Sequence, residues 1–203
     1  MHQEGKPFVV GRRIAVWGAT GSGKTTFARR LGAMLGLHVV ELDAIRHDRG
    51  WDSTPDDEFR ERLTRRLDEH PEGWVTDGSY SAISDVYLSR ADSLIWLHLP
   101  WPVSFARLFR RTVARAWTRA SLYLAAGPTE SWRMTFLSRR SILWWSIGHH
   151  RTYLRNVRER IAALRPEVAV YELRSSGEVE AFLLAAARQA PNAGKAAAEG
   201  SEL

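Results

Sequence analysis

Residues 18–25 read GATGSGKT, and this stretch constrains the fold of the chain more than any other. It matches G-x-x-x-x-G-K-[ST], a loop whose glycines let successive backbone N–H groups turn inward around phosphate oxygens. Such a loop has to lie between a strand and a helix. Residues 14–17 form a short apolar run before it, and Phe27, Leu31 and Leu35 recur every four residues after it. The sequence therefore predicts a nucleoside triphosphate site at the start of a helix, where the helix N-terminus adds positive charge.

Two side chains of this loop have specific expected roles. Lys24 is placed to reach the β- and γ-phosphates, and the Thr25 hydroxyl is placed to bind Mg²⁺. The alternative, a glycine-rich turn that matches by chance, does not explain the strand before the loop and the helix after it.

Composition limits the other chemistries that the chain can carry. Its 203 residues fit one α/β domain with an insertion, and the absence of cysteine excludes disulfides, thiolate chemistry and cysteine-ligated metals. No apolar stretch is long enough to cross a bilayer, and a cytoplasmic protein is expected. Residues 101–165 hold thirteen arginines and only two acidic residues, Glu130 and Glu159. Arginine grips phosphate bidentately, so this segment predicts a lid or anion site, or else a nucleic-acid surface.

The pattern along the chain alternates between strand and helix. Strands are expected at residues 14–17, 38–42, 74–76, 94–99 and 168–173, and helices from residue 55 and at 102–120, 130–164 and 178–189. Alternation of this kind predicts a doubly wound parallel sheet with ligands at the carboxyl ends of its strands. The expected organisation is a flexible N-terminus (1–11), one domain (12–190) with a lid-like helical insertion (about 115–155), and a disordered tail (191–203).

Two carboxylates follow predicted strands. Asp77 closes the strand at 74–76, the position of a carboxylate that holds Mg²⁺ through a water; the alternative is a turn or helix-cap residue. It is followed by Gly78 rather than by a glutamate that could activate water, which favours a transferase over a hydrolytic motor. Asp43 closes the second strand, where it is either the base that accepts a proton from an acceptor hydroxyl or an ordinary N-cap.

The arginine-rich segment contains aligned arginines and several tryptophans. In the helix at 102–120, Arg107 and Arg111 are closest to the strand end and are expected to stabilise the charge of phosphoryl transfer. The residues expected on a solvated face are Arg115 and Arg119, and those expected in a lid are Arg139, Arg140 and Arg151. The tryptophans are Trp101, Trp117, Trp132, Trp144 and Trp145. They either stack on arginines or bases, or pack a small helical subdomain on the core, which is the favoured interpretation.

Taken together, four blocks resemble adenylate-kinase-type P-loop kinases over roughly residues 12–185. These blocks are GATGSGKT, residues 41–43 (ELD), residues 74–80 (WVTDGSY), and residues 94–100 followed by Arg107 and Arg111. More narrowly, the chain is similar to the small kinase-like proteins of the bacterial DNA topology modulation group. The resemblance implies a five-stranded core of order 2-3-1-4-5, Mg²⁺ and ATP as cofactors, and a mobile lid.

Carried over, the resemblance assigns the residues that line the phosphates: Gly18, Ala19, Thr20, Gly21, Ser22, Gly23, Lys24, Thr25 and Thr26. One departure concerns the acceptor. Adenylate kinases have D-G-F-P-R after the third strand, whereas this chain has DGSYS at residues 77–81. It therefore lacks, at that place, the arginine that grips a monophosphate, which counts against AMP as acceptor.

The sequence thus predicts an ATP-dependent kinase that acts on an unidentified small-molecule acceptor. The expected catalytic residues are Lys24, Asp43, Asp77, Arg107 and Arg111, with Thr25 and Asp77 holding Mg²⁺. A nucleic-acid-binding regulator that uses ATP as a switch is the main alternative, since the arginine-rich segment would bind phosphates. Docking on a membrane surface through Trp144 and Trp145 is a third interpretation.

Overall fold

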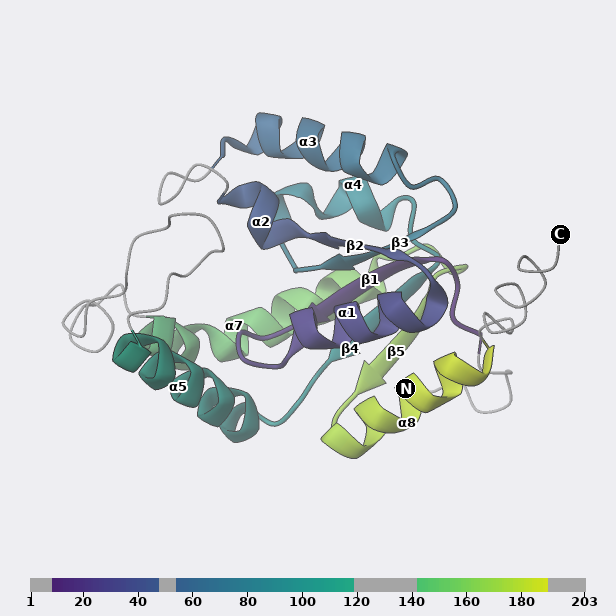
Figure 1. The fold of residues 1–203 in the computed structure, drawn as a ribbon. Helices are drawn as coiled ribbons and strands as arrows, with labels where there is room; N and C mark the ends of the chain where they lie inside the picture. The colour runs from purple at the N-terminus through teal and green to yellow at the C-terminus, as the bar shows by residue number, and fades with distance from the viewer. Residues whose placement is uncertain (1–8, 48–53, 119–141, 190–203) are drawn as a thin grey trace, which may run out of the picture.

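A five-stranded parallel sheet forms the centre of the computed structural model, which describes residues 9–47, 54–118 and 142–189 (Figure 1). Its order is β2-β3-β1-β4-β5. The strands are β1 (Arg13–Gly18), β2 (His38–Glu41), β3 (Trp74–Asp77), β4 (Ser93–Leu97) and β5 (Ala169–Leu173). All four neighbouring pairs are parallel. The predicted fold class and strand order are confirmed.

Helices cover both faces of the sheet and give a three-layer architecture. The helices are α1 (Lys24–Leu35), α2 (Leu42–Arg46), α3 (Asp56–Asp68), α4 (Ser84–Leu88), α5 (Trp101–Thr118), α7 (Ile142–Ala162) and α8 (Ser176–Gln189). Residues of α1 and α8 share one apolar cluster with the sheet, and residues of α3, α4 and α7 share the other. Figure 1 shows α5 apart from both layers, next to α7.

The central strand explains why two layers form. In β1, Ile14 and Val16 pack into the cluster of α1 and α8, whereas Ala15 and Trp17 pack into the opposite cluster. All four side chains are fully buried. A strand covered on both faces reads as a continuous apolar run, which is how this segment could be found in the sequence.

The structure corrects several predicted boundaries. The second strand ends at Glu41, and Leu42 begins α2 instead of closing the strand. Leu42 is fully buried in the cluster that also holds Val40, so its apolar character did not show where the strand stopped. The fourth strand ends at Leu97, although Leu99, two residues later, is also buried. The sequence pattern did not predict α4 or the 3₁₀ turn (Ser81–Ile83) before it.

The proposed insertion is described only at its two ends. Residues 115–118 continue α5, and residues 142–155 belong to α7, so both ends are helical. Residues 1–8 of the expected flexible N-terminus, the centre of the lid at 119–141 and the expected tail at 191–203 lie outside the described residues. Within the described ranges, no helix combines the length and the apolar character needed to cross a membrane.

Candidate active site

The GATGSGKT loop connects the central strand β1 to α1, as the sequence predicts. Gly21 and Gly23 have φ angles of 84° and 92°, in the left-handed region that favours glycine. Gly21 has a second reason to be glycine. A Cβ atom built there would lie 2.2 Å from the Ser104 carbonyl oxygen and 2.9 Å from the Leu108 Cβ atom, both in α5. The loop therefore lies directly against α5, which holds it from one side.

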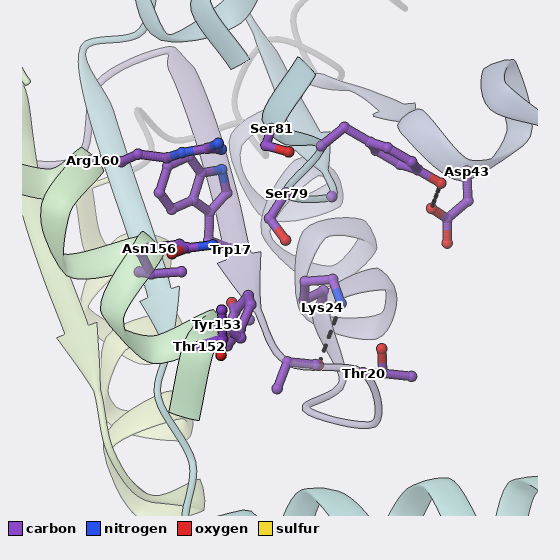
Figure 2. Close-up of a pocket in the computed structure, with 15 residues that line it drawn as sticks. Trp17, Thr20, Lys24, Asp43, Ser79, Ser81, Thr152, Tyr153, Asn156 and Arg160 are labelled. Atoms are coloured by element: carbon purple, nitrogen blue, oxygen red, sulfur yellow. Dashed lines mark hydrogen bonds between the residues drawn. The ribbon is translucent and has the colours of Figure 1, made fainter. Parts of the chain in front are cut away.

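Lys24 is buried at the centre of the site. Its Nζ atom donates a hydrogen bond to the Ala19 carbonyl oxygen at 3.4 Å, within its own loop (Figure 2). Burial lowers the pKa of this lysine, because the charged form loses its hydration. The carboxylates of Asp77 and Asp43 oppose this shift, and the positive charge of Arg111 adds to it. Four of the five predicted catalytic residues thus share one electrostatic neighbourhood.

Asp77 is the last residue of β3 and pairs in register with Val16 of β1, beside the loop. Burial raises the pKa of its carboxyl group, while Lys24 and a hydrogen bond from the Thr25 hydroxyl lower it. Its Oδ1 atom is buried and has no hydrogen-bond partner among the described residues. A buried carboxylate oxygen without a partner, next to a threonine hydroxyl, offers the hard oxygen ligands that Mg²⁺ prefers. The residues present therefore fit a magnesium ion.

The alternative role of Asp77 as a helix cap is not seen. The next helical turn begins at Ser81, and its N-cap is Tyr80. Gly78, directly after Asp77, has a φ of 142°, and a Cβ atom there would lie 3.0 Å from the Leu42 Cβ atom. A side chain at this position, where hydrolytic motors carry a glutamate, would therefore need both a strained positive φ and a small shift of Leu42.

Asp43 lies in the first turn of α2 and is exposed. The N-cap position belongs to Glu41, so the alternative interpretation of Asp43 as an N-cap is wrong. Its Oδ1 atom accepts a hydrogen bond of 2.7 Å from the Tyr80 hydroxyl, which fixes the orientation of the carboxylate (Figure 2). The sequence pattern did not assign Tyr80 to the site, although it lies in the WVTDGSY block.

Arg107 and Arg111 lie on α5, and both interact with the loop. The guanidinium group of Arg107 donates to the Ser176 hydroxyl at 2.9 Å and to the Ser22 carbonyl oxygen at 3.4 Å. Arg111 is close enough to Lys24 to lower its pKa. The side chains of the other arginines and tryptophans singled out in the segment lie outside the described part of the chain, except Trp101, which stacks on Phe105.

A cavity of about 450 Å³ opens on one side of Lys24 (Figure 2). Its lining comes from β1 and the loop, from Asp43, from the segment after β3, and from α7. Trp17 forms part of the wall, and its indole N–H donates to the buried Tyr87 hydroxyl at 3.0 Å. The α7 residues are Thr152, Tyr153, Asn156, Val157 and Arg160. No sequence motif identified these residues, because only the packing of α7 on the sheet brings them close to the loop.

A second cavity of about 350 Å³ lies on the other side of the loop, between α1, α5 and α8. It is lined by Ser22, Gly23 and Thr26 of the loop and first helical turn, together with Arg107 and the start of α8 at Ser176. The loop therefore separates two cavities, with Lys24 facing the larger one. No sequence pattern indicated the part of this cavity that α8 provides.

Comparison with known proteins finds only distant structural similarity. No protein-family model matches the chain, and no curated protein matches it. Among solved structures, a gluconokinase from Sinorhizobium meliloti 1021 is similar with a TM-score of 0.47 and 18% identity, over 94% of this chain and 98% of that chain. An unliganded sugar kinase from Janibacter sp. HTCC2649 has a TM-score of 0.37 and 21% identity, over 78% and 98%. Similarities this distant do not transfer a substrate, and none of them supports the narrower resemblance to the topology modulation group.

Proposed function

We propose that this chain is a phosphotransferase that moves the γ-phosphoryl group of ATP to a hydroxyl group of a small-molecule acceptor. The observation that carries the proposal is the pair of cavities on opposite sides of one phosphate-binding loop. Hydrolysis of a nucleotide needs one cavity and a water molecule. Transfer needs a second cavity that brings an acceptor to the same phosphate, and the cavity beside Lys24 and Asp43 meets that requirement.

The smaller cavity fits the nucleoside half of the donor. It begins at the loop residues Ser22 and Gly23, so a nucleotide whose phosphates lie in the loop can extend into it. Arg107 lines this cavity, with one nitrogen donating to the Ser22 carbonyl oxygen of the loop and another to the Ser176 hydroxyl. A guanidinium group held at both ends can face the nucleotide without losing further side-chain entropy, which favours binding.

The residues around Lys24 divide the chemistry among them. Lys24 and the loop amides bind the phosphates, and Thr25 and Asp77 would hold Mg²⁺, which when bound neutralises charge on the β- and γ-phosphates. Asp43, oriented by Tyr80, accepts the proton of the acceptor hydroxyl. The oxygen of that hydroxyl attacks the γ-phosphorus, and ADP leaves. Arg111 adds positive charge where the transition state spreads negative charge over the phosphoryl oxygens.

The test is Mg²⁺-dependent ADP formation by the purified full-length protein. ATP is supplied alone and with separate pools of polyols, hydroxy acids, nucleosides and nucleoside monophosphates. Lys24→Ala should abolish turnover, because the lysine charge is lost at the phosphates. The matched control is Arg65→Ala, which removes one positive charge from an exposed pair on α3, outside both cavities.

Two outcomes would contradict the proposal. Normal turnover in Lys24→Ala would show that the loop does not perform the reaction. Turnover that no small molecule stimulates, but that duplex DNA or RNA raises in a salt-dependent way, would favour the nucleic-acid-binding regulator instead.

A further inference from the structure

Arg160 lines the larger cavity on the side opposite Asp43 (Figure 2). It lies on α7 and is half-buried. Figure 2 shows Arg160 and Asp43 at opposite sides of the cavity, with Lys24 between them and nearer to Asp43. The cavity therefore has a reactive end, at Lys24 and Asp43, and a distant end with a positive charge.

The guanidinium group of Arg160 has no hydrogen bond or ion pair to any residue in the described ranges. Other arginines of the chain behave differently: Arg30, Arg46, Arg60 and Arg90 each pair with a carboxylate at 2.5–2.6 Å. The nearest acidic residue along α7, Glu159, faces Arg155 at 3.9 Å instead. A half-buried arginine that lines a cavity and has no partner among the described residues is available for an anionic group of a ligand.

From this arrangement we infer that the acceptor is a small hydroxy acid, whose carboxylate binds Arg160 while one of its hydroxyl groups reacts beside Asp43. The inference rests on the proposed phosphotransfer and adds the class of acceptor. It follows first from the separation of charge along the cavity. An anion held at Arg160 lies on the opposite side of the cavity from Asp43, so an acceptor bound there needs a second, reactive group beside Asp43 and Lys24.

The chemistry at the reactive end identifies that second group. Among the described residues that line the cavity, Asp43 is the only acidic one, and its charge acts on Lys24. Its negative charge would repel a phosphate or carboxylate oxygen that attacked the γ-phosphorus, whereas it can accept the proton of a hydroxyl group. The arrangement therefore disfavours a nucleoside monophosphate that reacts through its own phosphate.

The distant end favours a carboxylate over a phosphate monoester. Among the described lining residues, Arg160 supplies the one positive charge at this end, and Asn156, one turn before it on the same helix, adds a neutral hydrogen-bonding side chain. A carboxylate carries one negative charge and matches the planar guanidinium fork bidentately. A phosphate dianion would leave one charge uncompensated against the apolar walls formed by Trp17 and Val157.

The experiment compares acceptors that differ only in the anionic group. ADP formation is measured with D-glycerate, D-erythronate and D-gluconate, with the neutral polyols glycerol, erythritol and D-glucitol, and with glycerol 3-phosphate. We expect at least one hydroxy acid to stimulate turnover, and neutral polyols of the same length to do so at least about tenfold less. Arg160→Ala should raise the acceptor KM about 10- to 100-fold and leave the KM for ATP within about twofold.

Two variants of α7 sharpen the test. Arg160→Lys keeps the charge but loses the bidentate fork, so its acceptor KM should lie between those of the wild type and Arg160→Ala. Arg155→Ala, an exposed arginine of the same helix outside the cavity, should match the wild type.

Several results would overturn the inference while leaving the proposed function intact. A preference for neutral polyols or for glycerol 3-phosphate would do so. Phosphorylation of another class of acceptor, without stimulation by any hydroxy acid, would do so as well. Equal acceptor KM values in Arg160→Ala and Arg155→Ala would show that Arg160 does not bind the acceptor. Failure of the proposed function looks different, because ADP formation would then be absent with every acceptor or unaffected by Lys24→Ala.

Discussion

Replacement of Gly21 by alanine should damage the active site through α5 rather than through the loop alone. The new methyl group would lie 2.2 Å from the Ser104 carbonyl oxygen. That oxygen belongs to the backbone of α5, so no side-chain rotation relieves the overlap, and the helix has to move outward. Arg107 would move with it and lose its contacts with Ser22 and Ser176.

The chain provides a control that separates this overlap from backbone strain. Gly36 also has a positive φ, of 63°, but a Cβ atom built there would meet nothing within 4 Å. Gly36→Ala should therefore cost only the left-handed backbone strain of about 1–2 kcal/mol, reduced by about 0.4–1 kcal/mol because alanine restricts the unfolded chain. Gly21→Ala carries the same cost and adds about 1–3 kcal/mol of overpacking.

Urea unfolding monitored by tryptophan fluorescence gives the two free energies of unfolding, and calorimetric titration gives the ATP affinity. Gly21→Ala should be less stable than Gly36→Ala by about 1–3 kcal/mol. Gly21→Ala should also bind ATP at least about tenfold more weakly, because loss of one charge-assisted hydrogen bond lowers the affinity by about that factor. Gly36→Ala should bind ATP normally. Equal stabilities within about 0.5 kcal/mol, or equal ATP affinities, would refute the tight packing of α5 on the loop.

Three further perturbations test other parts of the site. Tyr87→Phe leaves the buried indole N–H of Trp17 without its acceptor, so the free energy of unfolding should fall by about 1–3 kcal/mol in urea titrations; an unchanged value would contradict this contact. Burial raises the pKa of Asp77 above its ordinary 3.8, and only the deprotonated form binds metal, so Mg²⁺ affinity in the ATP complex should increase from acid to neutral pH. Titration calorimetry should show this dependence weakened in Asp77→Asn, and an identical dependence would argue against the metal role. Arg107→Ala should weaken ATP binding about tenfold in the same assay, while Arg110→Ala, exposed on the same helix, should not.

The parts of the site that could be predicted are those encoded by a local pattern. The apolar run of β1, the loop glycines and the four-residue spacing in α1 occur within about twenty residues, and each has a direct physical reason. Asp77 could be placed for the same reason, since it ends a short buried strand. The strand order was implied by the family resemblance, and the structure has the same order.

The parts that could not be predicted depend on packing between distant segments. Arg160 follows Lys24 by more than a hundred residues, and only the packing of α7 on the sheet brings the two to one cavity. The start of α2 at Leu42 was hidden because a buried leucine fits a strand and a helix equally well. The hydrogen bond between Tyr80 and Asp43 joins two segments that have no common sequence pattern.

The shared wall between the two cavities has a consequence for ligand design. Because Ser22 and Gly23 line one cavity and Lys24 lines the other, a single molecule can occupy both by crossing the loop. Once its nucleoside end is bound, its other end is held at a local concentration of about millimolar or more. A compound that joins the two ends by a short linker of the right length should therefore bind about 10²–10⁴ times more tightly than either half.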